Sequence, residues 1–388
     1  MEHGTTVLLS IFVAFLAAQV GAEIAQRLKM PSVVGQLAAG VIVGPSVLAW
    51  AEIHEPLRVL AEIGAVLLLF SVGLETRIAE LKKVGKVALL VGVLGVIVPF
   101  MAGGAWAAAA GFDSYKAMFV AAAFVATSAG ITAKVLQELG VISRIESQII
   151  LGAAIIDDVL AMLLLVVVSS LQSGTGFDFL RLGTTIVQAL GFILLVVVVG
   201  RYVMNRSSNL MDAPVDPQSP LIISLVICLG LALAAAYIGL AAIIGAFLAG
   251  LILAETDHRS ALQKESKPIL AFVVPFFFVV TGMEVDMRML ASWDVLGTVL
   301  LVTLLAVAAK LVGASIGAAS LGFKGAMAVG VGMVPRGEVG IIIASLGRQA
   351  NVFGNTTYAV IIAMSLLTSV IAPPALKVLF KNEDAQPA

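Results

Sequence analysis

The sequence predicts an all-α polytopic membrane protein with about 13 transmembrane helices. Its 388 residues are 60% hydrophobic and only 12% charged, and the mean hydropathy is +1.09. A soluble domain of this length needs more charged surface. Apolar runs long enough to cross the hydrocarbon core, roughly 20 residues each, recur from one end of the chain to the other. The 37 glycines suit helices that pack closely or break inside the membrane.

The successive apolar runs define the predicted helices in chain order. The first is too long, and too polar at its end, for a cleaved signal peptide, so we interpret it as a span. The charge-free run 221–253 would form a helix of about 50 Å, too long for one crossing, and is divided near residues 237–240. The predicted spans are 5–27, 33–48, 57–74, 87–110, 117–136, 149–171, 182–203, 221–237, 240–253, 269–283, 295–321, 326–346 and 358–380.

The basic residues predict the orientation of these spans. With the N-terminus outside, 15 of the 23 Lys and Arg residues fall in cytoplasmic loops and 5 in external ones. Loops rich in Lys and Arg stay in the cytoplasm. The sequence therefore predicts an external N-terminus and a cytoplasmic C-terminus. The net charge of −1 and the lack of a basic run give no indication of nucleic-acid binding, and the lone Cys228 excludes a disulfide framework.

Thirteen spans can be divided into six, a linker and six, which predicts two inverted six-helix repeats. The fifth span contains the polar stretch 126–132. The twelfth span, its equivalent, contains residues 330–340, where Pro335 removes a backbone donor and several glycines loosen the helix. Interrupted spans at equivalent positions are the best pointer in a sequence to a transport site. We therefore expect two broken crossing helices near the middle of the membrane.

Two adjacent acids, Asp157 and Asp158, lie in the middle of the apolar run 149–171. An ionised carboxylate at the centre of a membrane helix costs about 2.5–3.5 kcal/mol on insertion scales. Such groups face the protein interior or a wet cavity and usually handle ions or protons. Neighbouring residues are separated by about 100° on a helix, so the pair would border one cavity from two directions.

Lys310 lies well inside the eleventh span, on the order of 13 Å from its cytoplasmic end. This is farther than a lysine side chain reaches comfortably to water, so its ammonium needs a partner, and the two aspartates are the candidates. Thr127 and Ser128 could offer oxygens to a hard cation or bond back to their own helix. Arg336 and Glu338 point to different faces. We expect them to fix the crossover by pairing with other helices.

Four charged residues occur near the predicted cytoplasmic ends of helices: Glu75, Arg77, Lys134 and Glu138. Charges at such positions are ordinarily solvated at the membrane interface. We therefore expect them to face water and to have no part in the site.

Five segments resemble motifs of the monovalent cation:proton antiporter family, in its bacterial aspartate–aspartate sodium/proton branch. They occur in the order typical of that family and cover nearly the whole chain. The segments are LLLFSVGLETR at 67–77, VATSAGITAKVLQELG at 125–140, ILGAAIIDDVLAMLLL at 150–165, AAKLVGA around Lys310 and GVGMVPRGEVG at 330–340.

The resemblance implies how the chain is organised. It implies a homodimer in a bacterial inner membrane, with a role in pH homeostasis. It further implies that Asp158 binds the ion, that Asp157 pairs with Lys310 and that Thr127 lies at the helix crossover. The implied regions are 1–78 (dimer-domain helices 1–3), 79–173 (core helices 4–6), 174–206 (linker helix 7), 207–290 (dimer-domain helices 8–10) and 291–388 (core helices 11–13 and a short tail).

The predicted function is secondary sodium/proton antiport, with lithium as a second substrate. A carboxylate can hold a proton or a cation but not both, and inverted repeats can expose it to the two sides in turn by an elevator-like movement. We expect this exchange to be electrogenic and to need neither a cofactor nor enzymatic chemistry. Potassium/proton antiport by the same machinery is the alternative.

Two rivals from other classes fit the sequence less well. An intramembrane aspartyl protease places its two aspartates on different helices, commonly within a Gly-x-Gly-Asp sequence, which this chain does not contain. An anion or organic-solute symporter is disfavoured by the acidic site.

Overall fold

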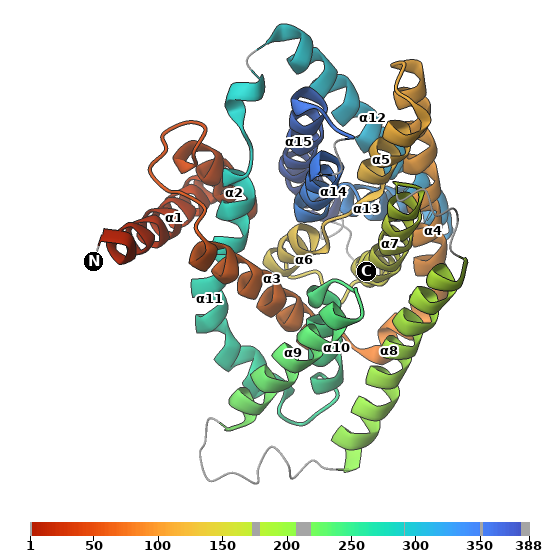
Figure 1. The fold of residues 1–388 in the computed structure, drawn as a ribbon. Helices are drawn as coiled ribbons and strands as arrows, with labels where there is room; N and C mark the ends of the chain where they lie inside the picture. Colours follow the sequence, from red (N-terminus) through yellow and green to blue (C-terminus); the bar gives the residue numbers. More distant parts are fainter. Residues whose placement is uncertain (1, 173–178, 207–218, 291, 350–351, 382–388) are drawn as a thin grey trace.

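The fold is described from a computed structural model, which describes residues 2–172, 179–206, 219–290, 292–349 and 352–381. Within these ranges the structure is helical throughout, as predicted (Figure 1). The helices are α1 Glu2–Arg27, α2 Ser32–Val43, α3 Glu55–Glu75, α4 Ile78–Ala109, α5 Ser114–Val125, α6 Ala129–Glu138, α7 Ile145–Gln172, α8 Phe179–Arg206, α9 Ser219–Tyr237, α10 Ala242–Leu253, α11 Arg259–Met283, α12 Trp293–Gly317, α13 Gly322–Gly332, α14 Gly337–Gln349 and α15 Asn355–Lys381.

Each predicted span corresponds to one helix or to one broken helix. The fifth span is α5 followed by α6, and the twelfth is α13 followed by α14. The division of the long run 221–253 is also correct, because α9 and α10 are separate helices. In the described residues, 8 helices are long and apolar enough to cross a membrane by length and composition. The predicted boundaries near residues 173 and 207 and the tail after 381 involve residues outside those described.

Several predicted helix ends are wrong. Helix α4 begins at Ile78 instead of residue 87, and α11 begins at Arg259 instead of residue 269. The predicted spans stopped where charged residues begin, but a helix keeps its backbone hydrogen bonds after it has left the hydrocarbon. In contrast, α2 ends at Val43, earlier than expected, because the chain turns through Gly44 to Ala49, whose φ is +52°.

The helices pack as two bundles that lie side by side in Figure 1. In the first bundle, α3 packs on α10 and α11, α2 packs on α1 and α11, and α9 packs on α10. In the second, α4 packs on α5, α7 and α12, while α15 packs on α12, α13 and α14. Helix α8 contacts both α7 and α10. Helix α6 contacts α7 and α15 of the second bundle and also α3 of the first, so it lies at the boundary between them.

Close backbone contacts hold the first bundle together. A Cβ atom added to Gly73 would lie 2.3 Å from the carbonyl oxygen of Phe247, and one added to Gly250 would lie 2.1 Å from that of Phe70. Helices α3 and α10 can approach this closely because neither residue has a side chain. Small residues at such contacts are the usual basis of helix association in membranes.

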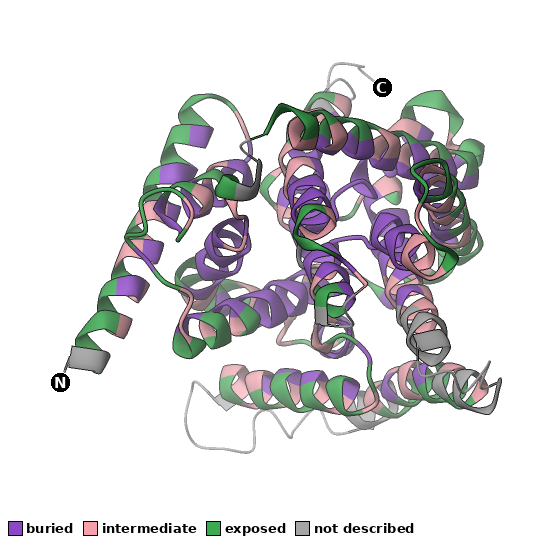
Figure 2. Cartoon of the chain, turned by 45° about the horizontal axis from the view of Figure 1, so that its top comes forward, coloured by how far each residue is buried: buried purple, intermediate pink, exposed green. Residues whose placement is uncertain are grey.

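The outward faces of several helices are exposed (Figure 2), and many of the exposed side chains are large and apolar. On α1 the exposed residues include Leu9, Phe12 and Leu16, and on α8 they include Val187 and Leu194. Water would not tolerate a surface of this kind, whereas lipid or a second protein surface would. The arrangement agrees with the polytopic membrane fold predicted from composition.

Candidate functional site

The two broken spans cross each other at their breaks. The backbone N–H of Ser128, between α5 and α6, donates to the carbonyl of Pro335, between α13 and α14, over 2.7 Å. The Thr132 hydroxyl of α6 donates to the carbonyl of Gly332 over 2.7 Å. Residues at one break therefore form hydrogen bonds with backbone groups at the other break that have lost their partners within a helix. Backbone groups inside a membrane need such partners.

Local sequence explains why both helices break here. The Ser128 side chain caps α6 by accepting from the Ile131 N–H over 3.5 Å. Pro335 has no N–H to continue α13. Gly337 has a φ of +44°, and an added Cβ would lie 2.6 Å from Ser128 Cβ, so this position has room only for glycine.

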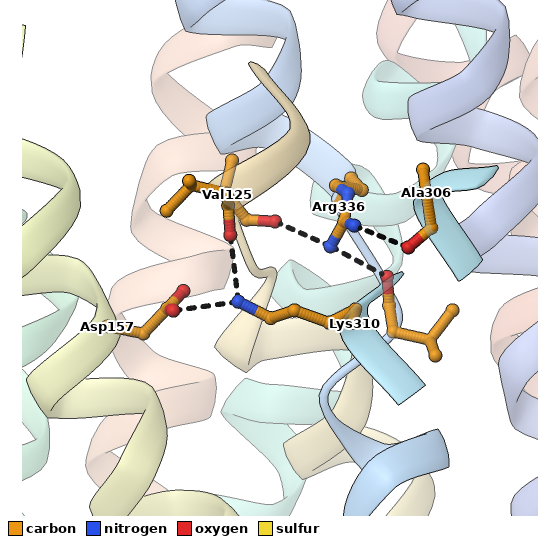
Figure 3. Close-up of polar contacts among 7 residues, drawn as sticks. Val125, Asp157, Ala306, Lys310 and Arg336 are labelled. Atoms are coloured by element: carbon orange, nitrogen blue, oxygen red, sulfur yellow. Dashed lines mark hydrogen bonds and ion pairs between the residues drawn. The ribbon is translucent and has the colours of Figure 1, made fainter. Parts of the chain in front are cut away.

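The carboxyl end of α5 meets two cationic side chains (Figure 3). Lys310 Nζ donates to the carbonyl of Val125 over 2.8 Å, and Arg336 Nη1 donates to the carbonyl of Ala126 over 3.1 Å. The carboxyl end of a helix carries a partial negative charge, which both cations complement.

Lys310 also meets the first aspartate of the pair. Its Nζ lies 2.7 Å from Asp157 Oδ1, and both side chains are 0% exposed (Figure 3). The structure thus brings together α7 and α12 through a buried ion pair. Removing one partner of such a pair leaves an uncompensated charge, at a cost of about 3–5 kcal/mol.

Two buried oxygens around the crossing lack hydrogen-bond partners within the described part of the chain. They are Oδ2 of Asp157 and Oγ1 of Thr127. Thr127 lies in the break between α5 and α6, at the crossover, and the residue is 2% exposed. Carboxylate and hydroxyl oxygens are ligands that hard cations prefer.

Asp158 has a different environment from its neighbour. It is only half-buried and borders a cavity of about 10 Å³ that is also lined by Leu69 of α3, Ala129 of α6 and Phe247 of α10. Because a cavity needs about 10–15 Å³ to hold one water molecule, this one is at most the size of a single water or small ion. Asp157 therefore faces the interior of the second bundle, whereas Asp158 faces the boundary between the bundles.

Arg336 is fully buried, and its guanidinium donates hydrogen bonds to carbonyl groups at both breaks. Besides Ala126, it donates through Nη2 to the carbonyl of Ala306 over 2.9 Å and through Nη1 to that of Val334 over 3.4 Å. Its partners are carbonyl groups on α12 and at both breaks. Glu338 lies in the first turn of α14, but its side chain is outside the described part of the structure.

A set of hydroxyl groups on α15 also contacts the second break and was not predicted from the sequence. Thr368 Oγ1 accepts from the Arg336 N–H over 3.3 Å, and Ser369 Oγ accepts from the Gly337 N–H over 3.1 Å. They serve as caps for α14, whose own start supplies no Ser, Thr, Asp or Asn. The hydroxyls at 365, 368 and 369 recur at helical spacing within an apolar span, a pattern that could have identified them.

Glu75 and Glu138 are not fully buried, in line with the expectation that they face water, but each also accepts hydrogen bonds from another helix. Glu75 Oε1 accepts from Gln137 Nε2 over 2.7 Å, and Glu138 accepts from both the N–H and the hydroxyl of Ser32. Helices that are distant in the sequence bring these partners together, so residue type and position gave no indication of them.

Crossed half-helices around a buried acidic site are characteristic of secondary transporters. Residues 11–382 match the family described as sodium/hydrogen exchanger, transmembrane. The chain belongs to this family of transporters, which confirms the resemblance inferred from its motifs.

Individual relatives cover nearly the whole chain. It is 34% identical to the high-affinity Na⁺/H⁺ antiporter NhaS3 of Synechocystis, over 98% of this chain and 91% of the relative. It is 33% identical to the Na⁺/H⁺-K⁺ antiporter GerN of Bacillus cereus, over 96% of each. The solved structure of the sodium proton antiporter MjNhaP1 from Methanocaldococcus jannaschii has a TM-score of 0.68 and 18% identity, covering 98% of this chain and 99% of that one. The last comparison supports the fold.

Proposed function

We propose that this protein is a secondary active antiporter that exchanges sodium or lithium ions for protons. The observation that carries the proposal is the half-buried Asp158 at the bundle boundary, one residue from an aspartate that is already paired with Lys310. A carboxylate in this position can take a proton or a cation in turn. Family membership and the named Na⁺/H⁺ antiporters among its relatives support this assignment.

The charges at the site support electrogenic exchange. With protons loaded, Asp158 is neutral and Asp157 balances Lys310, so the three side chains carry no net charge. Sodium needs an ionised Asp158 and draws Asp157 away from Lys310, which loses its proton in the dry interior. Two carboxylates, one sodium ion and a neutral amine then sum to −1. Two protons leave for each sodium ion that binds, and each cycle moves one charge.

The ligands available suit a small hard cation. Asp158 borders the small cavity, and Asp157 Oδ2 and Thr127 Oγ1 supply further oxygens near the crossing of the broken helices, outside the lining of that cavity. Potassium/proton exchange by the same machinery is the second candidate, because GerN is named as a Na⁺/H⁺-K⁺ antiporter. The relatives named as Na⁺/H⁺ antiporters support sodium as the first candidate.

The packing of the helices supports an elevator-like movement between two access states. We assign the first bundle as the dimer domain, with the exposed face of α1 available to a second copy, and the second bundle as the moving core. Helix α8 would link the two. The oxygens and the ion pair of the site all belong to the second bundle, so they would travel together.

The expected setting is the inner membrane of a bacterium, with the N-terminus outside, the C-terminus in the cytoplasm and a contribution to pH homeostasis. The basic-residue asymmetry supports this orientation. The exchange as formulated involves only the protein and the transported ions, without a cofactor or an enzymatic step.

The direct test is to measure dissipation of a preformed pH gradient in everted vesicles on addition of sodium, lithium or potassium. We expect responses to sodium and lithium and a much smaller one to potassium. A dominant potassium response would favour the second candidate. A lack of response to all three ions, with the protein present in the membrane, would contradict antiport.

A further inference from the structure

The boundary between the two bundles is closed at one end and open at the other. Helices α3 and α6 both end on the same side, where several side-chain hydrogen bonds join the bundles. On the opposite side, a cleft of about 350 Å³ separates the start of α3 and the end of α11 from α14 and the start of α15. Its lining includes Arg58 and Glu284 of the first bundle and Ser345 and Tyr358 of the second.

The first set of closing contacts joins α6 to α3. The side-chain amide of Gln137 donates one hydrogen to Ser71 Oγ and the other to Glu75 Oε1, each over 2.7 Å. The end of α3, which carries the acceptor Glu75, is held in place by α11. Arg259 of α11 donates to the backbone carbonyls of Leu74 and Glu75 over 2.9 Å each.

The second set joins α6 to the start of α2. Pro31 precedes this helix and offers no side-chain cap, and the Glu138 carboxylate takes that place by accepting from the Ser32 N–H, over 3.0 Å, and from its hydroxyl. A carboxylate at a helix N-terminus is electrostatically favourable. A third contact runs from Lys377 Nζ of α15 to the carbonyl of Lys29, over 2.8 Å.

These contacts lie on the same seam as the ion site. Leu69 and Ala129, which line the cavity beside Asp158, belong to α3 and α6. Glu75 and Gln137 are six and eight residues farther along these two helices, about 9 and 12 Å along the axes. Access to Asp158 along this seam requires α6 to separate from α3, and therefore requires the Gln137 contacts to break.

We propose that Gln137, Glu138 and their partners Ser32, Ser71 and Glu75 form a latch that keeps the seam closed on this side. The latch favours the state in which the cleft side is open, and its release is part of the step that exposes the site to the other side. With the expected topology, the latched side is cytoplasmic. The inference rests on the proposed alternating-access function and identifies residues that set its conformational equilibrium.

The test uses a reporter cysteine in place of Ile155, which lines the cavity beside Asp158, in a Cys228→Ser background. The full-length protein is placed in liposomes, and a membrane-impermeant thiol reagent is applied to each side separately. The readout is the labelling rate, which needs neither sodium nor proton movement. Failure of the latch and failure of the proposed antiport are therefore distinguishable.

Gln137→Leu removes both donors to α3, and Ser32→Ala removes the hydroxyl donor to Glu138. A hydrogen bond to a charged group shifts an equilibrium by about tenfold or more. We expect Gln137→Leu to raise the labelling rate from the latched side about tenfold, and the double variant to raise it further. Labelling from the cleft side should not increase.

Glu23→Gln is the matched control. It removes an exposed ion pair of 2.7 Å with Arg27 within α1, near the same side of the membrane, without touching the bundle boundary. Its labelling rate should equal that of the reporter alone. If the Gln137 and Ser32 variants do not fold, Lys377→Met removes the third contact, which lies at an exposed position, and the labelling rate should rise about twofold to threefold. Unchanged or slower labelling from the latched side in the folded variants would overturn the proposal.

Discussion

The two broken spans are equivalent in the predicted repeat, but their breaks differ in charge. The carboxyl end of α5 receives Lys310 and Arg336 on successive carbonyls. At the end of α13, Gly332 receives a neutral hydroxyl from Thr132 over 2.7 Å, and the only cationic contact described there is the longer one of 3.4 Å from Arg336 to Val334. The geometry of crossing is thus shared by both spans, whereas Lys310 and the shorter of these two Arg336 contacts are found at the α5 break.

This difference indicates how two equivalent broken helices can have different roles in ion binding. The break in the fifth span lies beside Asp157, and the Thr127 hydroxyl in this break has no hydrogen-bond partner among the residues that the structure describes. The break in the twelfth span supplies Arg336 and the Pro335 carbonyl, which hold the first break in shape. We interpret the first break as the ion-handling one and the second as its support.

The largest expected effect tests whether ion handling belongs to the carboxylate at the boundary. Asp158→Asn should reduce sodium-driven proton movement by more than about 100-fold, because an amide binds neither a proton nor a cation in exchange. The Asp157–Lys310 pair remains, so the thermal midpoint of the purified protein should change little. Antiport in vesicles and thermal unfolding measure the two effects. Near-normal exchange by the variant would remove Asp158 from its assigned role.

The second prediction tests the charge gathered at the α5 break. Lys310→Gln removes one of the two proton carriers and keeps Asp158, so exchange in liposomes should change from voltage-sensitive to voltage-indifferent. It also leaves Asp157 unpaired, and the free energy of unfolding should fall by about 3–5 kcal/mol.

Adding Asp157→Asn to Lys310→Gln is the matched control, because it removes both charges and should recover part of that stability. Transport is measured under an imposed membrane potential. Wild-type exchange that ignores the potential, or a glutamine variant with full voltage sensitivity, would contradict the two-proton scheme.

The smallest expected effects are changes in the free energy of unfolding caused by one substitution at each break. Arg336→Met deprives buried carbonyls at Ala126 and Ala306 of a charged donor, and should reduce the free energy of unfolding by about 2–3 kcal/mol. Thr132→Val deprives Gly332 of a neutral donor and should cost about 1 kcal/mol. The free energies of unfolding of the two variants are measured in detergent under identical conditions and compared. Equal losses would mean that the two breaks do not differ in the way described.

Much of the site could be predicted from the sequence because charged residues are rare within membrane spans. Asp157, Asp158 and Lys310 stand out in apolar runs, where an ionisable group is costly and needs a reason to be present. Pro335 and the glycines around it identified the twelfth span as broken, since they remove or weaken backbone hydrogen bonds whatever surrounds them. The fold class, the order of the spans and the two breaks therefore follow from the sequence alone.

The tertiary structure decided which groups meet. Both aspartates were candidates for Lys310, and their different surroundings depend on how α7 is rotated against α3 and α12, which no local pattern encodes. The hydroxyls of α15 that cap α14, and the contacts of Gln137 and Glu138 with the first bundle, likewise join residues far apart in the chain. A sequence fixes the cost of burying each polar group, but only the packed helices determine which partner offsets it.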